Sequence, residues 1–223
     1  MEDFPHNDSP INYDRVMRSQ IESLCGGGGA AGKPPDLLLH VCCAPCSSAV
    51  IERLAPFFTI TLFFYNPNIH PRREYEKRLS VLRAFAPALA AAENTEFPVV
   101  EGPYEPEVFY RETGVREEPS LQGEGERGER CRRCCRFRLR AAFGYAKTRG
   151  IGAVTTTLSL SPRKDARAIN AIGLELEAQC APVRFLCADF KKRDGYKRSL
   201  ELSKAYGLYR QTYCGCEYSL GTR

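Results

Sequence analysis

The sequence contains no run of about 18 consecutive apolar residues, so we expect no transmembrane helix. Residues 1–10 are acidic and lack an apolar centre, which argues against an ordinary secretory signal peptide. Tryptophan is absent, but leucine, isoleucine, valine and phenylalanine are plentiful, and this excludes intrinsic disorder of the whole chain. With 223 residues, 43% hydrophobic and 26% charged, we expect a globular cytoplasmic protein that does not associate with membranes.

Cysteine is the residue type in excess, with 11 copies. Their odd number, the missing export signal and a chain long enough to bury its own core argue against a disulfide framework. Clustered cysteines in intracellular proteins more often bind metals or carry out redox chemistry. The composition therefore points to a metal or redox protein.

The first 35 residues differ in character from the rest. Residues 12–24 have apolar side chains at helical spacing, and four consecutive glycines at 26–29 followed by Pro34-Pro35 indicate a flexible linker. The whole chain carries a net charge of +5, and this segment is acidic on balance, so the positive charge belongs to the remainder. We predict an N-terminal helix and linker at residues 1–35 and a single α/β metal-binding catalytic domain at residues 36–223.

From residue 37 onward, short apolar runs alternate with helical patterns. The predicted strands cover residues 37–41, 58–65, 95–100, 153–158 and 183–187. The predicted helices cover residues 47–54, 71–92, 104–112, 131–148, 162–179 and 196–206, and a Gly/Glu-rich loop without a core signal covers 114–129. This order indicates an α/β fold with a mostly parallel sheet of about five strands and helices on both faces. Ligands of such sheets bind beyond the carboxyl ends of the strands.

Three groups of cysteines fall at that edge of the predicted sheet. Their members are Cys42, Cys43 and Cys46 after the first strand, Cys131 and Cys134 at a helix start, and Cys214 and Cys216 near the C-terminus. A helix start favours the ionised thiolate, and Gly215 permits the turn that two alternate cysteines need to reach one centre. We expect the isolated Cys180 and Cys187 to be core residues and Cys25 to lie in the linker.

Two kinds of metal centre compete for these cysteines. A zinc ion uses four thiolates, fewer than the seven available, and two plain CxxC pairs would have favoured it. Iron–sulfur clusters also use about four cysteines, with more varied spacing. Seven could therefore serve a cluster together with a second metal or a redox thiol pair. The spacing favours iron–sulfur over zinc, and both over disulfides.

Several longer motifs occur together in this chain. They are NYDRV (12–16), LLLHVCCAPCSSAV (37–50), FFYNPNIHPRREYEKR (63–78), ERCRRC (129–134), TTTLSLSPRK (155–164) and DFKKRDGYKRSLELSKAYGLYRQTYCGCEYS (189–219). In this combination the sequence resembles the QueH family of epoxyqueuosine reductases, from about residue 12 to the end. The resemblance implies a Rossmann-like fold of the HUP or PP-loop kind.

The resemblance also implies a reaction and its cofactors. The epoxide of epoxyqueuosine, at the wobble position of tRNAs with a GUN anticodon (the Tyr, His, Asn and Asp acceptors), would become the cyclopentene of queuosine. The cofactors would be a 4Fe–4S cluster and an adjacent mononuclear iron, held by the seven grouped cysteines in a partition that the sequence leaves open. Our hypothesis is that the iron binds the epoxide oxygen while the cluster passes electrons singly. No flavin or nicotinamide motif occurs, so we expect an external electron donor such as a ferredoxin or a reductase.

Other residues are candidates for catalysis and binding. The candidate proton donors are Tyr213, Asp189, Tyr209 and His70, although His70 could simply be exposed and Asp189 could cap a turn or pair with Lys191. The candidate substrate and tRNA contacts are Asn66, Asn68, Ser161, Arg138, Lys191, Lys192 and Arg210. Six arginines between residues 130 and 140 and a basic patch at 191–198 suit phosphate contacts, with a solvated helix face as the alternative.

Two departures from the family pattern and two alternative functions complete the prediction. Cys135 stands where relatives usually have an aromatic residue, and we expect Cys134, not Cys135, to be the ligand. The loop at 114–128 looks longer than is typical, and we expect it to be a neutral insertion.

A zinc-stabilised tRNA-binding protein is one alternative function. A PP-loop enzyme is the other, but it would need a Gly-rich phosphate loop, and residues 42–48 contain no glycine.

Overall fold

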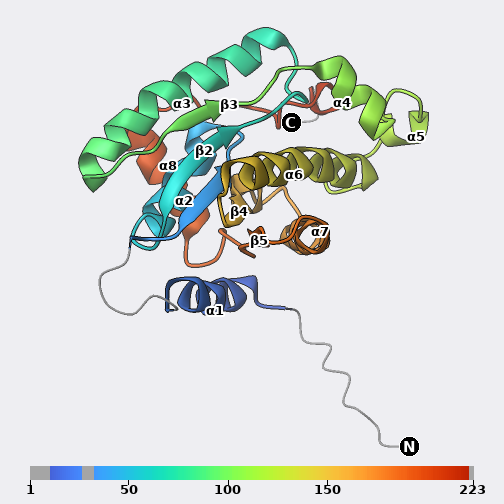
Figure 1. The fold of residues 1–223 in the computed structure, drawn as a ribbon. Coiled ribbons are helices and arrows are strands. Elements are labelled where there is room, and N and C mark those ends of the chain that lie inside the picture. The colour runs from blue at the N-terminus through green and yellow to red at the C-terminus, as the bar shows by residue number, and fades with distance from the viewer. Residues whose placement is uncertain (1–10, 27–32, 221–223) are drawn as a thin grey trace, which may run out of the picture.

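One sheet of five parallel strands forms the centre of the protein in the computed structural model, which describes residues 11–26 and 33–220 (Figure 1). The strands are β1 (Asp36–His40), β2 (Thr59–Phe64), β3 (Val99–Glu101), β4 (Ala153–Thr156) and β5 (Arg184–Phe185). Their order is β3-β2-β1-β4-β5, and every neighbouring pair is parallel. The predicted α/β fold is confirmed. The chain reverses its direction of travel across the sheet at β1, and such switch points form the ligand crevice of α/β proteins.

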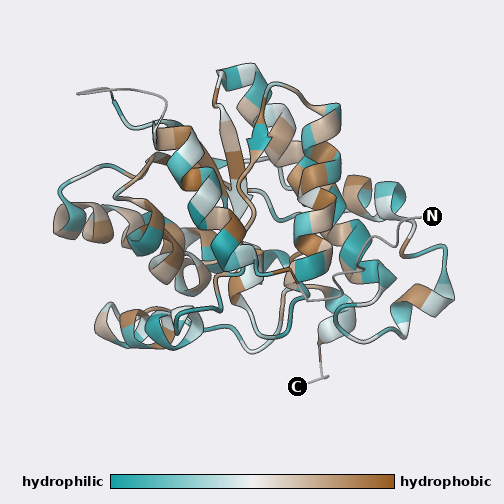
Figure 2. Cartoon of the chain, turned by 90° about the horizontal axis from the view of Figure 1, so that it is seen from below, coloured by the Kyte–Doolittle hydropathy of each residue, from teal (hydrophilic) through white to brown (hydrophobic). Residues whose placement is uncertain are grey.

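Helices cover both faces of the sheet. They are α1 (Tyr13–Gly26), α2 (Ala44–Leu54), α3 (Arg72–Glu93), α4 (Pro106–Thr113), α5 (Pro119–Gln122), α6 (Glu129–Arg149), α7 (Ala166–Gln179) and α8 (Gly195–Ala205), with short 3₁₀ segments η1 (Thr157–Leu160) and η2 (Glu217–Ser219). Buried residues of α2 and α3 join one apolar cluster, and those of α6 and α7 join another on the opposite face. Brown and teal residues share the same helices in Figure 2, as expected for amphipathic helices at a surface. Within the described ranges, no helix has the length and apolar character needed to cross a membrane.

Strand β1 is buried on both faces and ends in a histidine that ties three strands together. Leu37, Leu38 and Leu39 are each 0% exposed, which explains why the strand is continuously apolar. His40 Nε2 lies 3.2 Å from the carbonyl oxygen of Tyr65, so this nitrogen carries the proton, and Nδ1 accepts from Thr156 Oγ1 at 2.8 Å. Burial, followed by the charge of Arg138, lowers the pKa of His40 to about 3. The neutral imidazole of His40 therefore links the ends of β1 and β4, two residues before Cys42.

Helix α1 covers the β5 edge of the sheet. The side-chain amide of Gln20 donates to the carbonyl oxygen of Phe185 at 3.0 Å and accepts from the Cys187 backbone N–H at 2.8 Å, as a neighbouring strand would. Asp14 forms ion pairs with three arginines, of which Arg193 lies at 3.3 Å. The helix therefore satisfies backbone groups that an open sheet edge would leave unpaired.

Several elements differ from their predicted extents. The edge strand β5 has only two residues instead of the predicted five. Strand β4 ends at Thr156 instead of residue 158, because the Thr156 side chain accepts from Leu158 N–H and begins η1. Cys25 lies in the last turn of α1, so the prediction that it belongs to the linker was wrong. Most of the predicted glycine linker (27–32) lies outside the described residues. Residues 114–128 contain α5 and contribute the buried side chains of Val115 and Leu121, so the prediction of a loop without core contacts was wrong.

A close approach between α7 and β5 gives the first testable prediction. A Cβ atom on Gly173 would lie 2.2 Å from a ring carbon of Phe185, which is itself 1% exposed and cannot move aside. We therefore expect Gly173→Ala to destabilise the protein by about 1–3 kcal/mol, as other overpacked cores are. Urea unfolding followed by circular dichroism measures this change.

Gly144, on the exposed side of α6, is the matched control. A Cβ atom there meets nothing within 4 Å, so Gly144→Ala should stabilise the helix by about 0.5–1 kcal/mol. Equal unfolding midpoints for the two alanine variants would contradict the packing argument.

Candidate metal centre

Three cysteine sulfurs lie together where β1 ends and α2 begins. The Sγ atoms of Cys42, Cys43 and Cys46 are within 4.8 Å of one another, a spacing at which one metal centre can bind all three. Cys43 caps α2, and its sulfur accepts from the Cys46 backbone N–H at 3.4 Å. Among the described His, Cys, Asp and Glu residues, this trio is the one group of three or more whose ligand atoms lie that close together. The sequence placed it correctly, at the carboxyl edge of the sheet.

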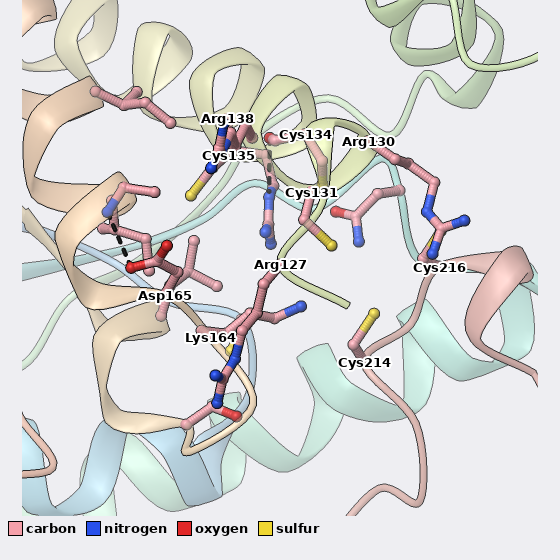
Figure 3. A pocket seen from close by; sticks show the side chains of 18 of the residues that line it. Arg127, Arg130, Cys131, Cys134, Cys135, Arg138, Lys164, Asp165, Cys214 and Cys216 are labelled. Atoms are coloured by element: carbon pink, nitrogen blue, oxygen red, sulfur yellow. Dashed lines mark hydrogen bonds between the residues drawn. The ribbon is translucent and has the colours of Figure 1, made fainter. Parts of the chain in front are cut away.

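The other two cysteine groups approach the same place from distant parts of the chain. One pocket is lined by six of the seven predicted ligands: Cys42, Cys46, Cys131, Cys134, Cys214 and Cys216. Figure 3 shows the sulfurs of Cys131, from the first turn of α6, and Cys214, from the C-terminal segment, directed into the same cavity. Tertiary structure thus brings together the groups that the topology predicted to be neighbours.

Arg78 holds the C-terminal pair of cysteines in position. Its side chain is 1% exposed, forms an ion pair with Glu74 at 2.7 Å, and donates to the carbonyl oxygens of Tyr213 and Cys214 at 3.1 and 3.0 Å. Gly215 has φ +110, and a Cβ atom on it would lie 2.8 Å from Ile69. Only glycine fits between the two cysteines, because both the backbone conformation and the space demand it.

A second buried arginine lies beneath the first cysteines. Arg138 donates to Asn66 Oδ1 at 3.1 Å, and the Asn66 amide in turn donates to the carbonyl oxygen of Val41 at 2.9 Å. Hydrogen bonding to Cys43 and Cys46, helped by the charge of Arg138, holds the pKa of Cys42 well below its ordinary value. Burial raises the pKa of Cys43 to about 12. The pKa of Cys42 therefore lies below that of its two neighbours, and a bound metal would ionise all three thiols.

Lys164 is a site residue that the sequence analysis did not single out, although it ends the TTTLSLSPRK motif. It lines the cysteine pocket and pairs with Glu126 at 3.1 Å. Burial opposes its charge, but Cys214, Cys131 and Glu126 outweigh burial and raise the pKa of Lys164. For Cys214, burial alone would raise the pKa. The Lys164 cation and a hydrogen bond with Ser219 outweigh burial, so the pKa of Cys214 is lowered. One feature of the sequence could have pointed to Lys164. It follows a proline-containing turn at the edge of the sheet where ligands were predicted to bind.

The segment at residues 114–128, predicted to be a neutral insertion, contributes Val115 and Arg127 to the lining of this pocket. Arg127 contributes to the pocket lining and donates to the carbonyl oxygens of Pro162 and Arg163. Arg130, 4% exposed, donates to three carbonyl oxygens between residues 121 and 124. These hydrogen bonds attach the loop to residues 162–163 and to the first turn of α6.

Two buried polar atoms near the cysteines have no hydrogen-bond partner within the described chain. They are Asn68 Oδ1 and Gln211 Oε1, and both residues line the pocket. Gln211 Nε2 lies 3.0 Å from Cys43 Sγ, so the amide faces the sulfur trio. Because buried acceptors are normally satisfied, these atoms indicate a ligand in the cavity. Asn68 and Ser161, both predicted as substrate contacts, do line this pocket.

The candidate proton donors lie outside the residues that line the pocket. The Tyr213 hydroxyl donates to the carbonyl oxygen of His70, and the Tyr209 hydroxyl to Glu74 at 3.0 Å. Asp189 pairs with Lys191 at 2.7 Å and accepts from the Lys191 backbone N–H, the structural role considered for it. The His70 side chain is exposed. The structure thus engages three of these side chains in local contacts and leaves the proton donor unassigned.

The predicted nucleic-acid contacts divide into buried and exposed residues. Arg138 and Asn66 are buried and bound to each other, and the Lys191 ammonium donates to the carbonyl oxygen of Ser159 at 3.0 Å. Lys192 and Arg210 are exposed. Of the six arginines between 130 and 140, four bind internal acceptors: Arg130, Arg133, Arg136 and Arg138. The arginine cluster is therefore mainly structural, since its charges face groups of the same chain.

Fold and site together define a parallel α/β protein with a cysteine cluster that could bind a metal at the carboxyl edge of its sheet. The family model described as epoxyqueuosine reductase QueH matches residues 37–222, and the chain belongs to this family. It is 37% identical over 210 residues to the QueH epoxyqueuosine reductase of Streptococcus pyogenes serotype M1, spanning 94% of this chain and 78% of the relative. The Thermotoga maritima protein of the same name is 37% identical over 188 residues, 82% of this chain and 90% of the relative. The relatives are thus named as oxidoreductases.

The Lys164 cation gives a testable pH dependence. In metal-free, reduced protein, Lys164→Met should move the midpoint of Cys214 alkylation by iodoacetamide to higher pH by about one unit, because the thiolate loses a nearby opposite charge. Mass spectrometry of the alkylated peptide measures it. Lys164→Arg keeps the charge and should leave the midpoint near that of the unmodified protein. An unchanged midpoint in Lys164→Met would show that Lys164 does not act on Cys214.

Proposed function

We propose that this protein is an epoxyqueuosine reductase that acts on the wobble nucleoside of tRNAs with a GUN anticodon, those for Tyr, His, Asn and Asp. The reaction takes up two electrons and two protons, removes the epoxide oxygen as water and leaves the cyclopentene ring of queuosine. Family membership and the six cysteines that line one pocket support this proposal. The convergence of three separate cysteine segments on one cavity is the observation that carries it.

The donor set fits a 4Fe–4S cluster with an adjacent iron. Seven cysteines in the three groups exceed what one zinc ion can use, and soft thiolates suit both iron centres. We propose Cys42, Cys43, Cys46, Cys131, Cys134, Cys214 and Cys216 as the ligands and leave Cys135 out. Cys135 is buried and also lines the pocket, but Cys131 and Cys134 keep the CxxC spacing of the ERCRRC motif. When bound, these groups would supply electrons and a Lewis acid for the epoxide oxygen.

The other residues of the chain bind, orient and shield the substrate. Asn68 Oδ1 and Gln211 Oε1 are free to accept hydrogen bonds from the substrate hydroxyls. Phe109, Leu158 and Ile169 form an apolar wall of the same pocket and exclude water from it. Lys164 keeps a positive charge beside Cys214, which stabilises negative charge on the ligands.

Two partners follow from this function. A tRNA must deliver the nucleoside, and an external donor, such as a ferredoxin or a reductase, must deliver the electrons. Substrate and donor of this kind place the protein in the cytoplasm. Both partners need access to one buried centre at the edge of the sheet.

Metal analysis of protein purified without oxygen tests the cofactor proposal. We expect about four to five irons and about four acid-labile sulfides per chain. About one zinc per chain with no sulfide would contradict the redox chemistry and favour a zinc-stabilised tRNA-binding protein.

Turnover with single cysteine variants then tests the function itself. Reduction of epoxyqueuosine-containing tRNA by dithionite should yield queuosine, detected by mass spectrometry of the nucleosides. Cys46→Ser should lose iron and lower turnover by at least about 10-fold, because losing a ligand should cost no less than losing a ligand's supporting contact. Cys180→Ser, at the end of α7 and outside the pocket lining, is the matched control and should keep both. Full iron content and full turnover in Cys46→Ser would exclude that residue as a ligand.

A further inference from the structure

A second cavity adjoins the cysteine pocket on the side of α8. We call it the lateral groove and define it by Cys46, Ser161, Arg163, Tyr196, Arg210 and Gln211. Three of these residues, Cys46, Ser161 and Gln211, also line the cysteine pocket, so the two cavities share a wall. The lateral groove therefore lies directly beside the candidate metal centre.

The lateral groove is large enough for an organic group. Its free volume is about 450 Å³. Sites for small organic ligands commonly measure about 300–1,000 Å³. The groove has room for a group as large as a nucleotide beside the candidate metal centre.

The side chains of the groove suit an anionic aromatic ligand. The Tyr196 ring is 37% exposed, and the Arg210 guanidinium lies over it at 6.0 Å from the centroid. The side chain of Arg163 is 52% exposed, with Glu126 at 3.9 Å, a separation that weakens the pair at an exposed position. None of the described residues that line the groove is acidic.

This combination matches the way proteins hold single-stranded RNA. Bases stack on exposed aromatic rings without sequence preference, and arginines contact the phosphates. An acidic protein surface would use the two arginines but would leave the recessed tyrosine ring without a planar partner. The groove chemistry therefore favours a nucleotide over a protein partner.

We propose that the lateral groove binds the nucleotide next in the chain to the substrate nucleoside, with its base stacked on Tyr196 and its phosphates held by Arg163 and Arg210. This inference rests on the proposed function and adds a binding subsite to it. The neighbouring nucleotide would then hold the RNA in register while the epoxide-bearing ring of the modified nucleoside reaches the cysteine pocket.

Salt-dependent RNA binding tests the two parts of the subsite separately. The probe is a fluorescently labelled anticodon stem-loop RNA with a GUN anticodon, titrated with the anaerobically purified holoprotein over a series of salt concentrations. Arg163→Gln and Arg210→Gln should each reduce the slope of log affinity against log salt by about 0.7, the value for one phosphate contact on a single strand. Tyr196→Leu should weaken binding about 10-fold with the slope unchanged, because stacking is not ionic. Tyr196→Phe retains a ring and should bind like the unmodified protein.

A matched control separates the groove from general surface charge. Arg149, at the far end of α6, also lies over a tyrosine ring, that of Tyr145, at 5.5 Å, and is exposed. Arg149→Gln should change neither affinity nor slope. The unmodified protein and Tyr196→Leu should bind a stem-loop that lacks the base next to the substrate position with the same affinity. That result would identify this base as the one that stacks on Tyr196.

The outcomes distinguish this proposal from the proposed function. If the unmodified protein binds the RNA and reduces epoxyqueuosine while all groove variants behave like Arg149→Gln, the subsite is wrong and the function stands. If the groove variants slow reduction by a protein electron donor but leave RNA affinity intact, the groove is a donor surface and the subsite is again wrong. If the unmodified protein neither binds the RNA nor acts on epoxyqueuosine, both proposals fail.

Discussion

Buried positive charge beside the cysteines is the constraint on which the site depends. Thiolates removed from water need cations or a metal nearby, and the protein places Arg78, Arg138 and Lys164 around its three cysteine groups. Each cation also holds a piece of backbone or a neighbouring side chain: Arg78 the C-terminal segment, Arg138 the end of β2, and Lys164 the segment that encloses the pocket. The same contacts therefore compensate the charge of the thiolates and hold the surrounding chain segments in place.

The parallel sheet explains why such distant segments meet. The first cysteines follow the central strand, so they occupy the switch point. Because each crossover returns the chain to the opposite edge, every strand of the parallel sheet ends at this edge. α6 begins at this edge with its two cysteines, and the C-terminal segment reaches it after α8. His40, Asn66 and Thr156, each at a strand end, lock the edge into one geometry through hydrogen bonds.

Arginine illustrates how little a charge pattern alone reveals. The six arginines between residues 130 and 140 suggest a nucleic-acid surface, yet four of them bind carboxylates, carbonyl oxygens or an amide of the same chain. The groove residues Arg163 and Arg210 are exposed and lie far apart in the sequence, and the guanidinium of each has one polar contact within the described chain, with Glu126 and Ser203 respectively. Whether a guanidinium serves folding or binding depends on which acceptors the fold places beside it.

The sequence by itself determined the α/β class, the order of the elements and the three cysteine groups, because periodicity, apolar runs and short motifs are local. It also indicated the family through contiguous stretches that need no structure. Only the tertiary structure decided that Lys164, Arg78 and Gln211 surround the cysteines, that residues 114–128 close the pocket, and that Tyr213 and Asp189 are engaged elsewhere. Those contacts join residues up to 168 positions apart, and such pairings depend on how helices and strands pack, which no local pattern records.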